Sequence, residues 1–135
     1  MSKPGLLLDT HVFVRWIDEP HRLSRDQRRV LDRVATVRGK ISVSAVTLIE
    51  IATLFGRGSK RSPLSAESIL ETLESVDTLD ILPINLRVAR EVAAMGDSLK
   101  DPNDRVIVAT ARIYDLCLVT SDQRIIASGL VPVVE

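Results

Sequence analysis

Aromatic residues and cysteines are scarce in this chain. Aromatics make up 3% of its 135 residues, which predicts an aliphatic core and argues against a surface that stacks successive nucleic-acid bases. The single cysteine, Cys117, lies in the stretch DLCLVT, so a disulfide framework is excluded. We expect Cys117 to be a small core residue in a reducing compartment, with a thiol pKa raised by its apolar neighbours.

Long apolar runs and an excess of charge are also missing. The N-terminal stretch MSKPGLLLDTH has an apolar run of three leucines, and no run in the chain approaches the roughly 18 residues of a membrane span. We therefore expect a cytoplasmic protein without a signal peptide or membrane segment. Because 18 basic residues balance 18 acidic ones, a polyanion would have to be held by local charge or by metal ions.

Length and composition indicate one globular domain over residues 1–135, since 45% of the residues are hydrophobic and 27% are charged. Short apolar clusters alternate with longer stretches of helical period. This pattern is typical of an α/β fold in which helices cover both faces of a parallel sheet. The strands are expected at residues 5–9, 40–43, 79–83, 116–119 and 131–134.

Helix-capping residues punctuate the rest of the chain. A first helix is expected to carry Phe13 and Trp16 into the core. Further helices are expected over residues 26–38, 45–55, 66–76 and 86–95, with a last helix that begins at Pro102. Their expected N-caps are Ser24, Ser44, Ser65, Asn85 and Asp101. Ser24 pairs with Gln27 in a capping-box pattern, and Gly39 and Gly96 are placed to end helices, Gly39 in the left-handed conformation.

The segment GRGSKRSP, residues 56–63, is expected to be a flexible loop, because it combines two glycines with the basic residues Arg57, Lys60 and Arg61. Two interpretations remain open for it, a solvated turn and a phosphate-binding loop.

Four acidic residues stand beside apolar runs: Asp9 after LLL, Glu50 within LIEIA, Asp104 before RVIVATA and Asp122 after LVTS. Carboxylates in such positions are seldom buried unless they are paired or bind a metal. Asp9 and Asp122 follow strands, at the sheet edge where α/β proteins bind ligands. Asp104 begins a helix at the same edge, and Glu50 can point back to it from the second turn of its helix.

Each acid also has a simpler interpretation by itself. Asp9 and Asp122 could end strands in Asx turns, Asp104 could complement a helix dipole, and capping alone explains Asp101. Together, however, the four carboxylates of the apolar runs would repel one another in a partly dry pocket unless a cation joined them. An all-oxygen donor set favours Mg²⁺ or Mn²⁺ over zinc.

Polar side chains next to these acids are predicted to support them. Thr10, Thr120 and Ser121 are expected to orient the carboxylates, although their positions at strand ends also suit plain capping. His11 is expected at the rim of the pocket or in packing, and His21 on a surface loop.

The motifs LLLDTH, LIEIA, DPNDRVIVATA and LVTSD, in this order over residues 6–134, resemble those of PIN-domain ribonucleases, most closely the VapC-like toxins of toxin–antitoxin pairs. The resemblance implies a three-layer α/β/α sandwich, one or two Mg²⁺ or Mn²⁺ ions per active site, and endonucleolytic cleavage of RNA. It also implies a homodimer and a VapB-like antitoxin that covers the acidic pocket.

The resemblance assigns roles residue by residue. The family's metal-binding acids fall on Asp9, Glu50, Asp104 and Asp122, Asp101 matches an acidic position often present, and Thr120 matches a hydroxyl that supports the last acid. The chain departs from the family pattern at Asn103, where an aromatic residue is usual, and at Ile49, where a tryptophan is frequent. Neither departure removes a metal ligand.

We expect a metal-activated water to attack the phosphodiester, so that no side chain acts as a covalent nucleophile. The residues expected to contact RNA phosphates are Arg15, Arg57, Lys60, Arg61, Lys100 and Arg105, with Arg105 as the leading candidate. An alternative is a PIN-like module without turnover that binds RNA or protein. A magnesium-dependent phosphatase of the haloacid dehalogenase type is disfavoured, because His11 stands where its second aspartate would be.

Overall fold

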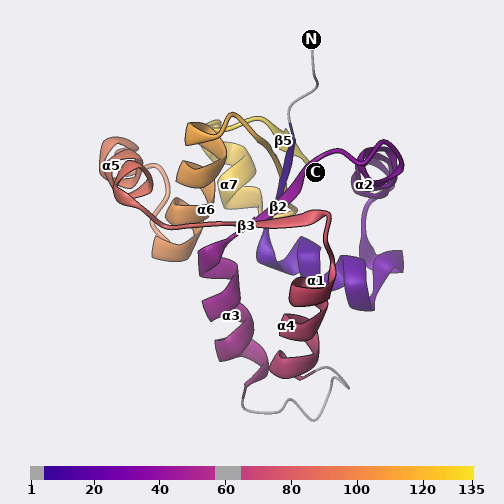
Figure 1. Cartoon of the computed structure of the whole chain (residues 1–135). Coiled ribbons are helices and arrows are strands. Elements are labelled where there is room, and N and C mark those ends of the chain that lie inside the picture. Colours follow the sequence, from indigo (N-terminus) through magenta and orange to yellow (C-terminus); the bar gives the residue numbers. More distant parts are fainter. Residues whose placement is uncertain (1–4, 57–64) are drawn as a thin grey trace.

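The computed structural model of the chain describes residues 5–56 and 65–135. Five parallel strands form one sheet: β1 (Leu6–Leu8), β2 (Ile41–Ser44), β3 (Leu79–Leu82), β4 (Cys117–Val119) and β5 (Val133–Val134). The strand order is β3-β2-β1-β4-β5 (Figure 1). The expected parallel sheet is confirmed, and each strand lies within the expected segment or one residue beyond it.

Alternate side chains of β1 enter separate cores on the two faces of the sheet. Leu6 and Leu8 belong to one buried cluster and Leu7 to the other. The first cluster is covered by α1 (Thr10–Asp18), α2 (Arg25–Thr36) and α4 (Ala66–Ser75), and the second by α5 (Leu86–Ala94), α6 (Pro102–Ile113) and α7 (Gln123–Ser128). Helix α3 (Ala45–Phe55) contributes Ile51 to the first and Val46 to the second. The α/β/α sandwich is thus confirmed.

The expected N-caps form as local hydrogen bonds. Ser24 and Ser65 complete capping boxes, and the side chains of Ser44, Asn85 and Asp101 accept hydrogen bonds from main-chain N–H groups in the first turns of α3, α5 and α6. Local chemistry therefore sets where these helices begin.

The end of α2 differs from the expectation. Arg38, rather than Gly39, takes the left-handed conformation, with φ of 54°. Gly39 is required for a close approach instead, because a Cβ atom there would lie 2.9 Å from Cγ1 of Val34. At the end of α5, Gly96 ends the helix as expected and adopts the left-handed conformation, with φ of 71°.

Two short elements escape the sequence patterns, the 3₁₀ helix η1 (Pro20–Arg22) and α7, because segments of this length show no clear helical period. Strand β5 is shorter than expected, since Pro132 before it has no N–H to donate to the sheet. The half-buried Cys117 packs against the first core cluster, and burial raises the pKa of its thiol as expected. Within the described residues, no helix is long and apolar enough to cross a membrane.

Candidate active site

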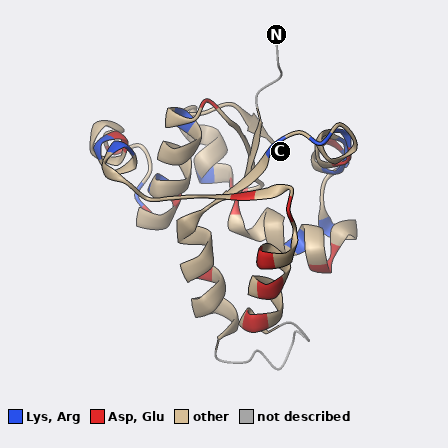
Figure 2. Cartoon of the chain, viewed as in Figure 1, with Lys and Arg blue, Asp and Glu red and all other residues tan. Residues whose placement is uncertain are grey.

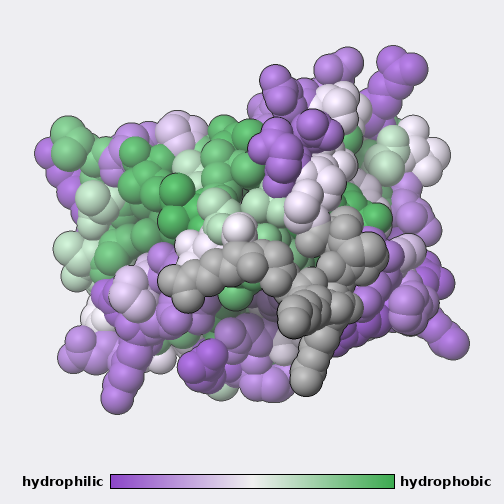
Figure 3. Space-filling model, turned by 90° about the horizontal axis from the view of Figure 1, so that it is seen from below, coloured by the Kyte–Doolittle hydropathy of each residue, from purple (hydrophilic) through white to green (hydrophobic). Residues whose placement is uncertain are grey.

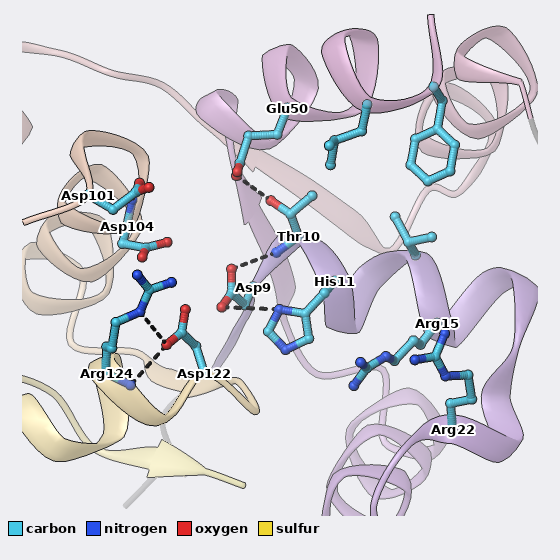
Figure 4. A pocket seen from close by; sticks show the side chains of 13 residues that line it. Asp9, Thr10, His11, Arg15, Arg22, Glu50, Asp101, Asp104, Asp122 and Arg124 are labelled. Carbon is cyan, nitrogen blue, oxygen red and sulfur yellow. Dashed lines mark hydrogen bonds and ion pairs between the residues drawn. The ribbon is translucent and has the colours of Figure 1, made fainter. Parts of the chain in front are cut away.

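The pocket of interest lies where the strand order reverses. Strands β1 and β4 are neighbours, and successive connections lead from β1 toward β2 on one side and from β4 toward β5 on the other. Such switch points leave a crevice beyond the carboxyl ends of the strands. A cavity of about 410 Å³ occupies this place, and five carboxylates line it: Asp9, Glu50, Asp101, Asp104 and Asp122 (Figure 4). The structure therefore brings together all the acids that the sequence singled out.

Asp9 is the most deeply placed of these acids, with 5% of the residue exposed. It follows β1 directly and caps α1, because its Oδ1 accepts a hydrogen bond of 2.9 Å from the main-chain N–H of Thr10. Its Oδ2 accepts a hydrogen bond of 2.7 Å from the hydroxyl of Thr120. Both carboxylate oxygens are thereby fixed in direction, and the helix-capping role and the pocket role coincide in one residue.

Glu50 reaches the pocket from the second turn of α3, as expected. Its Oε1 accepts a hydrogen bond of 2.7 Å from the hydroxyl of Thr10. Because that proton is used, the hydroxyl of Thr47, 2.9 Å away, is the donor to Thr10. Burial is the largest influence on Glu50 and raises the pKa of its carboxyl. Thr47 lacks a sequence signal, since it sits in an otherwise apolar helix.

Among the pocket acids, Asp104 has a strongly raised pKa. Burial, the largest cause, and the negative charges of the other pocket acids together raise the pKa of its carboxyl to about 7. Its side chain points into the pocket from the start of α6 (Figure 4). The negative charges of the other four pocket acids therefore oppose the ionisation of Asp104.

Asp101 and Asp122 are both N-caps. Asp101 accepts hydrogen bonds from the main-chain N–H groups of Asn103 at 2.9 Å and Asp104 at 3.0 Å, so its capping role is visible in the structure. Asp122 caps α7 through the N–H of Arg124 at 2.9 Å. The side chain of Arg124 folds over the same carboxylate, with Nε 3.5 Å from Oδ1 of Asp122.

The polar residues after β4 hold two of these acids together. The hydroxyl of Thr120 donates to Asp9 and accepts a hydrogen bond of 3.0 Å from the N–H of Asp122. Ser121 was expected to orient a carboxylate. Its hydroxyl instead accepts a hydrogen bond of 3.0 Å from Nε2 of the buried Gln27. Ser121 therefore anchors the turn to α2.

His11 lines the pocket between Asp9 and this turn (Figure 4). Burial, the largest influence, lowers the pKa of its imidazole, and the nearby Asp9 opposes that change. The neutral imidazole is therefore favoured. His21, in contrast, is exposed on η1, as expected.

Basic residues form the opposite end of the same cavity. Arg15, which was expected there, and Arg22 lie together away from the carboxylates (Figure 4). Arg22 and Arg124 were not anticipated from the sequence, because their places depend on how η1 and α7 fold over the pocket. Lys100 lines an adjoining cavity of about 220 Å³ with Asp101 and other residues. Arg57, Lys60 and Arg61 lie outside the described residues.

Arg105, which was expected as the leading phosphate contact, also has a structural role that the sequence did not reveal. Its Nη1 donates to the carbonyls of Gly96 at 2.6 Å and Leu99 at 2.5 Å, and its Nη2 donates to the carbonyl of Val92 at 2.6 Å. These carbonyls belong to the end of α5 and the connection to α6. Three of the five N–H donors of the guanidinium are therefore used to join the two helices.

The carboxylate oxygens of the pocket are the type of ligand that hard divalent cations prefer. The acids offer only oxygen, and burial together with the neighbouring negative charges raises the pKa of Asp104. In the part of the chain that the structure describes, no three His, Cys, Asp or Glu side chains are already close enough to enclose an ion. The acids thus face a common space without touching, and an ion would draw them together.

Fold and pocket define an α/β protein with an acidic ligand site at its switch point, and comparison with known proteins gives the family. A family model described as the PIN domain matches residues 6–128. The chain is 34% identical over 122 residues to ribonuclease VapC22 of Mycobacterium tuberculosis, a match that covers 89% of this chain and 88% of the relative. The chain belongs to the PIN-domain family, as its motifs indicated.

Solved structures agree in fold. The chain is similar to VapBC2 of Rickettsia felis bound to a promoter DNA fragment, with a TM-score of 0.72 and 18% identity, over 96% of this chain and 97% of the other. It is also similar to FitAcB of Neisseria gonorrhoeae, with a TM-score of 0.67 and 25% identity, over 96% of each chain.

Asp104→Asn tests the crowding of charge. Because folding raises the pKa of Asp104 from 3.8 to about 7, the folded chain binds this proton more tightly, and stability falls as pH rises through that window. The variant should therefore melt a few degrees higher than the wild type at pH 8 in EDTA, and the gain should shrink toward pH 4. Asp80→Asn, at an exposed position of β3, is the control. A lower or unchanged midpoint for Asp104→Asn at pH 8 would contradict this electrostatic picture.

Arg105→Ala tests the structural role of this guanidinium. Hydrogen bonds from charged donors contribute about 1.5–3 kcal/mol each, so the variant should lose at least about 2 kcal/mol of unfolding free energy in a denaturant titration. Arg105→Lys should recover only part of the loss, since an ammonium lacks the planar fork. The exposed Arg90→Ala on the neighbouring α5 is the control. Full stability of Arg105→Ala together with weakened RNA binding would restore the phosphate-contact interpretation.

Proposed function

We propose that this chain is a divalent-metal-dependent endoribonuclease and acts as the toxin of a toxin–antitoxin pair. The observation that carries the proposal is the convergence of Asp9, Glu50, Asp104 and Asp122 from four separate elements on one pocket. Membership of the PIN-domain family and the similarity to a protein named ribonuclease VapC22 support the same activity.

In this proposal, the four acids hold one or two Mg²⁺ or Mn²⁺ ions, with Asp101 as a candidate fifth ligand beyond its cap. The metal, when bound, supplies an activated water and stabilises the charge that develops on the departing oxygen. The chain's own hydroxyls prepare the acids for this task. Thr120 orients Asp9, and Thr10 orients Glu50, so the directions of these carboxylates are set before an ion binds.

The same cavity offers separate places for metal and phosphate. The carboxylates form one end, and Arg15 and Arg22 form the other, which places positive charge where an RNA strand would leave the metal site (Figure 4). Arg124 and Lys100 lie beside the acids. We propose Arg15, Arg22, Arg124 and Lys100 as phosphate contacts that position the strand without recognising its bases. Arg57, Lys60 and Arg61 stay proposals from the sequence.

Asp9→Asn and Glu50→Gln test the activity. Because replacing groups that merely support metal ligands commonly lowers metal affinity or activity 10–100-fold, replacing a ligand should lower Mn²⁺-dependent cleavage of an RNA panel by about 100-fold or more. Glu67→Gln on the exposed surface of α4 keeps the size of the change and should cleave normally.

Cleavage at wild-type rates by either pocket variant would refute the assigned mechanism. Binding of RNA without cleavage by the wild-type protein, over the same panel and with either metal, would instead favour the alternative of a PIN-like module without turnover.

The proposed partners are a VapB-like antitoxin and a second copy of the chain. The solved relatives from Rickettsia felis and Salmonella typhimurium are VapBC assemblies bound to DNA, which supports an antitoxin for this chain. We propose that the antitoxin covers the acidic pocket and so blocks access of RNA.

The proposed homodimer has a candidate surface. Exposed large apolar side chains gather on α3, on the edge strand β3 and at the start of α5, namely Ile49, Leu54, Ile81, Ile84 and Leu86. Apolar surface is also prominent in the view from below (Figure 3). The neighbouring α4 presents acidic residues instead (Figure 2), so the apolar surface has a charged border.

Leu86→Glu tests this surface. Leu86 is 72% exposed, so a charge there should leave the melting midpoint nearly unchanged, but it should prevent association of the apolar surface. Light scattering after size exclusion should give a dimer for the wild type and a monomer for the variant. Val37→Glu is a matched control, since Val37 is 70% exposed at the end of α2 and should stay dimeric. A monomeric wild type, or a dimeric Leu86→Glu, would exclude this interface.

A further inference from the structure

The imidazole of His11 connects two parts of the pocket that lie far apart in sequence. His11 is the second residue of α1, directly after Thr10, and its ring sits between Asp9 and the turn that follows β4 (Figure 4). Its Nε2 accepts a hydrogen bond of 3.0 Å from the main-chain N–H of Ser121. Its Nδ1 lies 3.4 Å from Oδ2 of Asp9.

These contacts define the tautomer of the ring. A nitrogen that accepts a hydrogen bond from a main-chain N–H carries no proton itself, and a neutral imidazole has a proton on one of its nitrogens only. The proton of His11 is therefore on Nδ1, the nitrogen that lies 3.4 Å from Oδ2 of Asp9. The ring thus places its N–H beside a pocket acid on one side and accepts a hydrogen bond from the Ser121 turn on the other.

We propose that His11, as the Nδ1–H tautomer, is a positioning residue that fixes the Asp9 carboxylate relative to the turn carrying Asp122. This inference rests on the proposed metal-dependent function. Asp9 and Asp122 come from different strands and repel each other, so their separation has to be set by groups that contact both sides. His11 does this through Asp9 Oδ2 and the N–H of the residue just before Asp122.

The surrounding contacts complete a closed frame around the turn. Thr120 donates to the same Oδ2 of Asp9 and accepts from the N–H of Asp122. Ser121 is held a second time, through its hydroxyl, by Nε2 of Gln27. With Oδ2 held by Thr120 and faced by His11, the orientation of the Asp9 carboxylate plane depends on both.

A role for His11 as general base is excluded by the same geometry. Nε2 uses its lone pair on Ser121, and Nδ1 carries the proton that faces Asp9, so neither nitrogen has a free lone pair to take a proton from water. His11 therefore acts through Asp9 and the turn and does not touch the reacting atoms.

The tautomer can be observed directly in the wild-type protein. The chain has two histidines, so ¹⁵N-histidine labelling gives two sets of imidazole signals, and His21→Gln assigns them. Above the titration range of histidine, we expect the Nδ1 of His11 to be protonated and its Nε2 to have the shift of an unprotonated nitrogen. A proton on Nε2 would overturn the proposal, because Ser121 could then not donate to it.

Substitutions test the consequence for metal binding. Mn²⁺ affinity is measured by calorimetry, with thermal midpoints recorded in parallel. His11→Ala should weaken Mn²⁺ binding about 10–100-fold, the usual effect of removing a group that orients a ligand. His11→Asn keeps an amide N–H near the place of Nδ1 and should recover part of the affinity. The exposed His21→Ala should bind as the wild type does.

The outcomes separate this inference from the proposed function. Wild-type Mn²⁺ affinity in both His11 variants, while Asp9→Asn is impaired, would overturn the role of His11 and leave the metal site in place. Wild-type affinity in Asp9→Asn would overturn both. A loss of thermal stability in His11→Ala with unchanged Mn²⁺ affinity would show a purely structural residue and would also overturn the proposal.

Discussion

Repulsion between carboxylates is the constraint on which this pocket depends. Five acids line one cavity, and their combined charge, together with burial, raises the pKa of Asp104 to about 7. Three of the five are also helix N-caps: Asp9 for α1, Asp101 for α6 and Asp122 for α7. Each of these accepts at least one main-chain N–H group in the first turn of its helix. Asp104 and Glu50 make no such cap, and the pKa of each is raised, chiefly by burial.

Hydroxyl groups orient the carboxylates of the pocket by hydrogen bonds. Thr10 donates its main-chain N–H to Asp9 and its hydroxyl to Glu50, so one residue fixes two acids from different elements. Thr120 does the same for Asp9 and the main chain of Asp122. Because the Thr10–Glu50 and Thr120–Asp9 bonds join segments that are distant in sequence, they tie these acids to neighbouring elements of the fold. Their relative positions are set by the sheet, which places β1 beside β4.

Much of this could be predicted from the sequence, for reasons that differ between features. The N-caps Ser24, Asn85 and Asp101 depend on neighbouring residues, so local patterns reveal them. The convergence of Asp9 and Asp122 follows from a general property of parallel sheets, whose carboxyl ends share one edge. Acids beside apolar runs can be recognised in the sequence because burying a carboxylate without a partner or a metal costs free energy. Family resemblance then added the RNA substrate and the partners, which no local pattern contains.

Features that depend on tertiary contacts were missed. The hydrogen bonds of Arg105 to main-chain carbonyls were not foreseen, because the positions of these carbonyls depend on how α5 packs on α6. Ser121 contacts Gln27 of α2, a pairing that spacing along the chain does not reveal. The most direct test of the central claim is the anomalous scattering of crystals grown with millimolar Mn²⁺. A peak about 2.1 Å from oxygens of Asp9 and of further pocket acids is predicted, whereas no ion, or an ion bound only elsewhere, would contradict it.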